Sequence, residues 1–343
     1  MKVESYLLDA ANACRERRIA FALYCKPFSE ECVFLADAGG SEARGGREFF
    51  AVGFNGHFAD RFVIRDSVGI TQIYEYPIDP ISGNGKVSDN PSRADYIAEV
   101  TSLISELHAS GGKCVISRIF PMSFDRNDFY DGVNELFASN ANAFRALFYT
   151  PDAGCWIVAS PEVLADISEN NFKTMSLAGT RPAGSSSSWD EKNIREQRIV
   201  TDTIEADLKD LGIKPELSRT FTLRSNLVEH LCTNINATLS ENISIGMLLD
   251  KLSPTPAIAG FPRDESLAQI GKFEDFSRKL YGGYFGIAEG KNLLAHVTLR
   301  CAEILDETLA VYAGSGVTPD SAAAEEWEEI NAKARQFSNC FTN

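Results

Sequence analysis

The sequence lacks long apolar runs. Charged residues interrupt every apolar stretch in the segment that follows Met1, KVESYLLDAANACRERR. Other apolar segments, such as RIAFALYC (18–25), are far shorter than the roughly 20 residues of a membrane-spanning helix. We therefore expect neither a signal peptide nor a membrane span, and we expect the protein in the cytoplasm.

Metal-binding patterns of histidine and cysteine are also missing. The 4 histidines lie far apart, and the 8 cysteines include no CxxC pair. Most of these cysteines stand within apolar, strand-like runs. This favours reduced, buried thiols and excludes a zinc centre; disulfides are not expected either.

Positive charge is in short supply. The chain has 33 Lys and Arg residues against 48 Asp and Glu, a net charge of −15. Nucleic acids and anionic membranes would be repelled by such a field, so neither is an expected partner. A small anionic substrate is compatible with it if the site itself carries cations. No glycine-rich loop joins a strand to a helix, which excludes a Rossmann or P-loop nucleotide site.

Apolar residues are plentiful, at 44% of 343 residues, enough for a large core. Strand-like runs fill the first third and return at 113–120, 143–150, 155–160 and 172–179. Helical patterns cover 92–110, 189–211, 225–239, 243–252 and 264–281. Strands are predicted at 282–290, 293–305 and 308–316, followed by an acidic helix from about 319.

Strands that follow one another with tight connections favour antiparallel sheets with helices packed outside. No linker or fixed-period repeat divides the chain. We therefore predict an α+β fold, a single intertwined domain over 1–343, whose central element is antiparallel β-sheet. Within this domain, residues 1–90 have the least specific sequence patterns, and residues 90–340 contain the sequence motifs described below.

The acidic stretch EEWEEINAK (325–333) has two interpretations. On a helix Glu326, Glu329 and Lys333 share one face. They could form a solvated face in which Glu329 pairs with Lys333. Alternatively, the carboxylates could hold a hard cation such as Mg²⁺, which prefers carboxylate and water oxygens. The stretch alone leaves both open.

Several motifs occur together and in a fixed order. They are KCVISR (113–118), SPE (160–162), SLAGTRPAG (176–184), EKNIREQRIV (191–200), LSPTPAIAGFP (252–262), YGGYFG (281–286), TLR (298–300), AGSGV (313–317) and EEWEEINAK. This set resembles the chorismate-utilising enzymes, which include isochorismate synthase, salicylate synthase and the large subunits of anthranilate and aminodeoxychorismate synthases. The resemblance covers about 90–340.

The resemblance implies a catalytic pair. Lys113 matches the family's general base, which activates water and must lose its proton near neutral pH. Glu162 matches the general acid, which needs a raised pKa to stay protonated. From the residues alone, Lys113 could instead cap the preceding helix, and Glu162 could lie in the first turn of a helix after Ser-Pro.

The resemblance also implies a binding set and a Mg²⁺ cofactor. Glu196 and Glu329 match the metal ligands, with Glu326 as an outer or water-mediated ligand. Arg300 and Lys333 match side chains that grip substrate carboxylates. Further positions match substrate contacts: Gly179, Thr180, Tyr281, Gly314 and Gly316. Outside the family context Gly179 could form an ordinary turn and Arg300 a salt bridge at a strand end. Isochorismate synthases often have histidines at the positions of Arg195 and Gln197, and Ser253 replaces a frequent histidine.

Two positions distinguish reactions within the family. Ammonia-using members carry glutamine in place of Lys113, so Lys113 favours water and no glutaminase subunit is expected. Ala257 stands where salicylate, anthranilate and aminodeoxychorismate synthases tend to have threonine. Together they favour an isochorismate synthase that binds chorismate as a monomer or weak homodimer. Salicylate synthase is the alternative, followed by an ammonia-using synthase and by a non-catalytic chorismate- or metal-binding protein.

Overall fold

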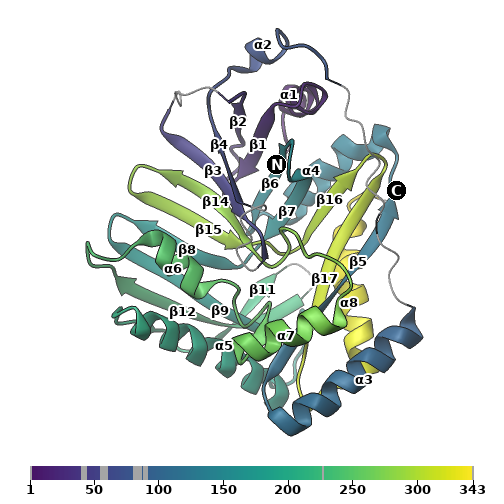
Figure 1. The fold of residues 1–343 in the computed structure, drawn as a ribbon, viewed down its shortest axis with the longest axis vertical. Helices are drawn as coiled ribbons and strands as arrows, with labels where there is room; N and C mark the ends of the chain where they lie inside the picture. The colour runs from purple at the N-terminus through teal and green to yellow at the C-terminus, as the bar shows by residue number, and fades with distance from the viewer. Residues whose placement is uncertain are drawn as a thin grey trace.

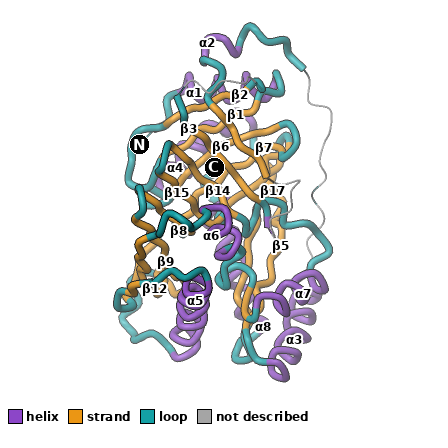
Figure 2. Tube along the Cα trace, turned by 60° about the vertical axis from the view of Figure 1, so that its left-hand side comes forward, coloured by secondary structure: helices purple, strands orange, loops and turns teal. Residues whose placement is uncertain are grey.

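Two antiparallel β-sheets form the centre of the molecule, with helices on the outside (Figure 1, Figure 2). The computed structural model describes residues 2–39, 45–54, 61–79, 87, 92–225 and 228–341. Every strand pairing in it is antiparallel. The predicted α+β fold with central antiparallel sheets is confirmed.

The first sheet has the strand order β13-β5-β17-β16-β7-β6-β1-β2. Its strands are β1 (Ala20–Cys25), β2 (Val33–Asp37), β5 (Lys113–Ser123), β6 (Phe144–Thr150), β7 (Gly154–Ser160), β13 (Gly260–Phe261), β16 (Cys301–Leu305) and β17 (Thr308–Val317). The longest ladder in this sheet joins β5 to β17, from Cys114 opposite Val317 to Ser123 opposite Thr308.

The second sheet has the order β10-β12-β9-β8-β15-β14-β3-β4, with β11 paired to β12. Its strands are β3 (Arg47–Val52), β4 (Arg61–Arg65), β8 (Val163–Ser168), β9 (Asn171–Pro182), β10 (Glu216–Leu217), β11 (Phe221–Ser225), β12 (Val228–Thr238), β14 (Tyr284–Glu289) and β15 (Asn292–Val297).

Helices cover the sheets. They are α1 (Ser5–Glu16), α2 (Ile70–Ile73), α3 (Arg93–Ser110), η3 (Arg126–Asp128), α4 (Phe129–Ser139), α5 (Glu191–Asp210), α6 (Ile245–Leu252), α7 (Arg263–Phe273) and α8 (Ala323–Ser338). In Figure 1, α1 and α2 lie at the upper end, while α3, α5, α7 and α8 gather at the lower end. α5 packs against β9, and α8 packs against β17. None of the helices within the described ranges is long and apolar enough to cross a membrane.

Aromatic residues fill the space between the two sheets. Phe148 of β6 lies 5.0 Å from Phe49 of β3, and Phe144 lies 5.1 Å from Phe285 of β14, measured between ring centroids. All four side chains are fully buried. Because β1 is covered by α1 on one face and by the second sheet on the other, its sequence AFALYC is apolar throughout.

The segment predicted as a helix at 225–239 forms β12 instead, so that prediction was wrong. Buried and exposed residues alternate along its second half, from Asn234 to Thr238, which is the two-residue period of a strand. The ladder to β9 runs from Val228 to Thr238. Apolar residues here also occur at helical spacing, and the long ladder decides in favour of the strand.

Two further elements are shorter than predicted. The helix expected at 264–281 ends at Phe273 because Glu274 takes an extended conformation, with φ −110° and ψ 120°. The strand expected at 293–305 is divided between the two sheets, as β15 and β16. The break falls at Arg300, whose φ of 47° lies in the left-handed region and cannot continue a strand.

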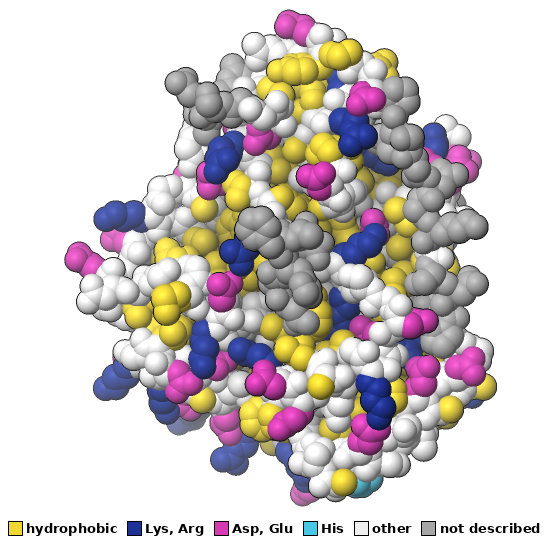
Figure 3. Space-filling model, viewed as in Figure 1, with side chains coloured by type: hydrophobic (Ala, Val, Ile, Leu, Met, Phe, Trp, Pro, Cys, Tyr) yellow, Lys and Arg dark blue, Asp and Glu magenta, His cyan; other side chains and the backbone are white. Residues whose placement is uncertain are grey.

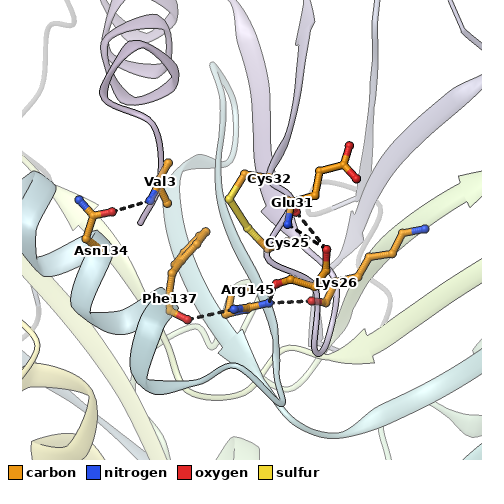
Figure 4. The surroundings of a disulfide bond; sticks show 9 residues. Val3, Cys25, Lys26, Glu31, Cys32, Asn134, Phe137 and Arg145 are labelled. Atoms are coloured by element: carbon orange, nitrogen blue, oxygen red, sulfur yellow. Dashed lines mark hydrogen bonds between the residues drawn. A yellow bond between two sulfur atoms is a disulfide. The ribbon is translucent and has the colours of Figure 1, made fainter. Parts of the chain in front are cut away.

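A disulfide joins Cys25 to Cys32, which corrects the expectation that all thiols are reduced (Figure 4). Cys25 follows Tyr24 and Cys32 precedes Val33, the last pair of the β1–β2 hairpin, and the Cα atoms of the two cysteines are 4.7 Å apart. Hairpin pairing brings the sulfur atoms together, and the spacing of seven residues in sequence does not reveal this. Below the disulfide, Arg145 donates hydrogen bonds to the carbonyls of Lys26 and Phe137.

The described surface mixes both signs of charge. On the face shown in Figure 3, Lys and Arg side chains are scattered among Asp and Glu side chains and do not gather into one basic patch. This distribution agrees with the net charge of −15. It gives that face no stripe for a nucleic-acid backbone.

Candidate active site

One cavity collects the predicted site residues, although they come from positions 113 to 333 of the chain. All of them except Glu326 line it: Lys113, Glu162, Gly179, Thr180, Glu196, Tyr281, Arg300, Gly314, Gly316, Glu329 and Lys333. Strands of both sheets and the helices α5 and α8 form its walls. Ala257, the position that differs between reactions in the resembling family, also lines it.

Glu162 is a buried carboxylic acid. It lies between β7 and β8, so the alternative that it begins a helix is wrong. Its side chain is 3% exposed, and Thr255 donates a 3.5 Å hydrogen bond from Oγ1 to Oε1. Burial raises the pKa of Glu162 to about 7, although Lys113 and Thr255 act in the opposite direction. Near neutral pH, a large fraction of this group therefore carries its proton.

Lys113 begins β5 and points into the same cavity. It is 1% exposed, and its Nζ lies 2.7 Å from Oε1 of Glu196 on α5. The C-terminus of α3 is closed by the backbone N–H of Gly111, which donates to Leu107, so the helix-capping alternative for Lys113 is wrong. The position thus holds the buried amino group of Lys113 against the Glu196 carboxylate at the cavity wall.

Glycine at 316 is required by this ion pair. A Cβ at Gly316 would lie 2.7 Å from Cε of Lys113 and 2.9 Å from Oε1 of Glu196, closer than side chains approach. Gly314, two residues earlier on the same face of β17, would place a Cβ 2.7 Å from the hydroxyl of Tyr281. The AGSGV motif therefore keeps β17 open where Lys113 and Tyr281 enter the cavity.

The acidic helix α8 turns its charges inward. Glu326 is 1% exposed and accepts a 2.9 Å hydrogen bond from Lys192 of α5. Glu329 lies 2.7 Å from Lys333, which also donates to the carbonyl of Gly314 at 3.0 Å. The Glu329–Lys333 pair of the first interpretation is present. The interpretation of a solvated helix face is wrong for Glu326, because its side chain is buried.

The pKa values of Glu326 and Glu329 shift in opposite directions. Burial and the neighbouring Glu329 charge raise the pKa of Glu326, although Lys192 opposes them. Desolvation also acts against the Glu329 charge, but Lys333 and other lysines outweigh it and lower its pKa. One carboxylate of the pair is thus held ionised while its neighbour retains a proton more readily.

The carboxylates fit a hard cation by their chemistry. Each of the three is engaged by a lysine: Glu196 by Lys113, Glu326 by Lys192 and Glu329 by Lys333. Within the described ranges, no three His, Cys, Asp or Glu side chains already stand in an arrangement that would hold a metal ion. Oε2 of Glu326, however, is buried without a hydrogen-bond partner among them. Oxygen ligands of this kind suit Mg²⁺ once the lysines release them.

Arg300 and the β9 residues Gly179 and Thr180, at a bulge in the pairing with β12, line another side of the cavity. Arg300 occupies the left-handed turn between β15 and β16, and burial lowers its pKa to about 10, which leaves it cationic at neutral pH. Gly179 has a φ of 71°, a conformation that favours glycine. The backbone N–H of Thr180 donates to Oδ1 of Asn193 at 3.0 Å, which fixes this part of β9 to α5.

His230 is a cavity residue that the sequence prediction missed. Its Nδ1 lies 3.0 Å from the carbonyl of Gly179, which can only accept, so Nδ1 donates and Nε2 is left as an acceptor. Burial, assisted by the charge of Arg300, lowers the pKa of His230 to about 4 and keeps the ring neutral. The helix predicted at 225–239 concealed this residue; its place on a strand opposite Thr180 of β9 is the signal that would have found it.

Two residues that depart from the resembling pattern lie away from the cavity. Arg195 forms an exposed ion pair with Asp320 at 2.6 Å. Gln197 is 3% exposed, and its Nε2 donates to Oγ of Ser176 at 2.9 Å. Gln197 therefore anchors α5 to β9 and helps to fix the helix that carries Glu196.

Comparison with known proteins identifies the family of this chain. Residues 75–342 match the model of a family described as chorismate binding enzyme. The chain belongs to this family. The match includes every residue placed in the cavity above. Proteins of several bacteria are similar in sequence to this chorismate-binding enzyme.

The chain is 29% identical over 249 residues to isochorismate synthase EntC of Escherichia coli K12, covering 67% of this chain and 62% of EntC. It is 31% identical over 209 residues to isochorismate synthase MenF of the same strain, covering 57% and 47%. Anthranilate synthase component 1 of Pseudomonas aeruginosa is 29% identical over 194 residues, covering 52% and 39%. The chain thus spans less than two thirds of EntC and about half or less of the other two.

Solved structures share the fold. MenF, the menaquinone-specific isochorismate synthase from Escherichia coli, superposes with a TM-score of 0.79 at 20% identity, covering 99% of this chain and 92% of MenF. Anthranilate synthase component I from Streptococcus pneumoniae superposes with a TM-score of 0.69 at 15% identity, covering 93% and 90%. At these identities the likeness establishes the fold of this chorismate-binding enzyme, and the reaction has to be argued from the site.

Proposed function

We propose that this protein is an isochorismate synthase, an isomerase that converts chorismate to isochorismate. The observation that carries the proposal is the placement of Lys113 and Glu162 in one cavity, a buried lysine and a buried carboxylic acid whose pKa is about 7. The similarity to isochorismate synthases EntC and MenF supports the same reaction. No glutaminase partner is needed, since water is the nucleophile.

The reaction balances as an exchange of water. Lys113, as the free amine, accepts a proton from a water molecule whose oxygen forms a bond to C2 of the ring. The ring double bond shifts, and the C4–oxygen bond breaks. Glu162 donates its proton to the departing hydroxyl, which leaves as water. One water is consumed and one is released, so no oxidant, reductant or ammonia is required.

The cations of the cavity bind the substrate's two carboxylates. Arg300 offers a planar, bidentate guanidinium, and Lys333 offers a point charge close to Gly314. The neutral ring of His230 presents an acceptor nitrogen for a substrate hydroxyl. These groups orient the ring between Lys113 and Glu162, which is the positioning that a two-proton exchange needs.

Mg²⁺ is the cofactor of this proposal, with Glu196 and Glu329 as ligands and Glu326 in an outer position. A bound Mg²⁺ supplies positive charge that turns this acidic cluster into a site for an anionic substrate. If Glu196 held the cation, it would no longer hold Lys113, whose Nζ lies 2.7 Å from it here, and the amino group would be free to face the cavity.

Product analysis tests the proposal. Purified protein with chorismate and Mg²⁺ should yield isochorismate without stoichiometric pyruvate, resolved by chromatography. Ala257 supports this outcome, because a methyl group at the cavity wall offers no hydroxyl to assist elimination. Pyruvate matched by salicylate would assign the protein to salicylate synthase. Anthranilate formed from ammonium salts would overturn the role of Lys113, and chorismate binding without turnover would indicate a non-catalytic protein.

A further inference from the structure

A second cavity, of about 620 Å³, lies on the outer face of the first sheet and shares no residue with the chorismate cavity. Its floor is a row of side chains from four neighbouring strands. Phe21 of β1 and Cys155 of β7 both stand opposite Tyr149 of β6, and Cys155 stands opposite Ile304 of β16. Phe21, Cys155 and Ile304 line the cavity and are 3% exposed or less. The floor is therefore apolar and preformed.

Two helices form the walls. α1 contributes Leu8 and Ala11, both buried, and α4 contributes Phe129 and Tyr130. The hydroxyl of Tyr130 donates to Asp9 of α1 at 3.2 Å, which joins the two walls. A volume of this size is in the range that encloses a small organic ligand.

One cation of the cavity, Arg15, lacks a partner among the described residues. Arg15, in the last turn of α1, lines it, and its Nε is buried without a hydrogen-bond acceptor among the described residues. No described carboxylate forms an ion pair with it, whereas the other cation of the lining, Arg126, pairs with Asp306 at 3.2 Å. A buried donor without an acceptor costs free energy that an anionic group of a ligand would recover.

The acidic side chains of the lining also limit the charge that a ligand can carry. Glu16 and Asp306 line the same cavity, and their carboxylates would repel a polyanion such as a nucleotide. A single negative charge facing Arg15, on an otherwise apolar body, matches the lining. We propose that this cavity binds a small apolar monoanion, such as an aromatic or cyclic carboxylate, with its anionic group on Arg15.

A pair of matched probes tests the site. The fluorescent probe 8-anilinonaphthalene-1-sulfonate carries an apolar body and one negative charge, and N-phenyl-1-naphthylamine is the same body without the charge. The full-length protein should bind the sulfonate saturably and more tightly than the neutral probe. Arg15→Gln should weaken sulfonate binding about tenfold and remove the preference, while neutral-probe binding stays within twofold.

Arg18→Gln is the control, since Arg18 carries the same charge just beyond α1 and does not line the cavity. It should leave sulfonate binding within twofold. Circular dichroism and chorismate turnover confirm that each variant is folded. The proposal is overturned if the wild type shows no saturable binding, if Arg15→Gln binds the sulfonate as tightly as the wild type, or if Arg18→Gln weakens it equally.

Discussion

At the scale of single residues, the proposed chemistry depends on two buried groups of opposite character. Lys113 is 1% exposed and Glu162 is 3% exposed, and both face one cavity. Lys113→Ala and Glu162→Ala should each lower kcat by roughly 10²–10⁴-fold, the usual contribution of a positioned acid or base. Chorismate binding, measured by calorimetry, should survive in both.

Exposed residues of the same types provide controls for these variants. Lys291→Ala and Glu241→Ala lie on the surface and should keep kcat within twofold. Near-native turnover by either cavity variant would remove that residue from its catalytic role.

The raised pKa of Glu162 predicts a pH dependence with a definite sign. The folded-state pKa is about 7, so the acid form is present below that pH and is lost as pH rises through it. A general acid works only while protonated, and kcat/KM should therefore fall above about pH 7. Initial rates at chorismate concentrations well below KM, with saturating Mg²⁺, from pH 6 to 9 measure this. A profile that does not fall between pH 7 and 9 would contradict Glu162 as the acid.

At the scale of elements, a buried ion pair behind the cavity fixes β5 to the segment that carries Ala257. Arg278 donates to both carboxylate oxygens of Glu274, at 2.6 and 2.8 Å, and both side chains are 2% exposed. Arg278 also donates to the carbonyls of Val115 in β5 and of Ile258. Glu274 accepts a 2.7 Å hydrogen bond from the backbone of Ser117.

Removing one partner of this pair should be costly. Arg278→Leu leaves the Glu274 carboxylate buried and uncompensated, which should lower the free energy of unfolding by roughly 3–5 kcal/mol. Urea titration measures the loss. The double variant with Glu274→Met should recover part of it, because no buried charge is left. The exposed pair of Arg126 and Asp306 is the control, where Arg126→Leu should change stability by about 0.5 kcal/mol or less. An equal loss of stability in Arg278→Leu and Arg126→Leu would contradict the cost assigned to the unpaired buried charge.

The limits of prediction from sequence are also set at this scale. Helices with clear start and stop signals were predicted well: Ser92 accepts a hydrogen bond at the start of α3, and Gly111 ends that helix. β12 was not predicted, because its pairing with β9 comes from residues far away in the chain. The role of His230 depends on that pairing. Arg300 interrupts a run that reads as one strand, and only the two sheets together require a break there.

At the scale of the whole molecule, the acidic cluster joins two distant helices. Glu196 lies on α5, and Glu326 and Glu329 lie on α8. An ion that binds all of them only in the folded state should stabilise that state by mass action. Mg²⁺ alone, without chorismate, should therefore raise the melting temperature, and EDTA should abolish activity until Mg²⁺ is restored.

Matched variants on α8 make this prediction specific. Glu329→Gln should remove the Mg²⁺-dependent rise in melting temperature, measured by calorimetry. Glu325→Gln, on the same helix but exposed, should retain it. Full activity in excess chelator, or an equal rise in both variants, would exclude the assigned ligands.

The pairing of β5 with β17 has a consequence for how the chain is made. Cys114 stands opposite Val317, so the partners are separated by roughly 200 residues, most of the chain. A ribosome adds about 5–20 residues per second, which means that the strand bearing Lys113 is synthesised on the order of ten to forty seconds before its partner. During that interval the apolar edge of β5 lacks this partner. The nascent chain therefore exposes this edge until β17 has been synthesised, and we expect it to need protection from aggregation over that interval.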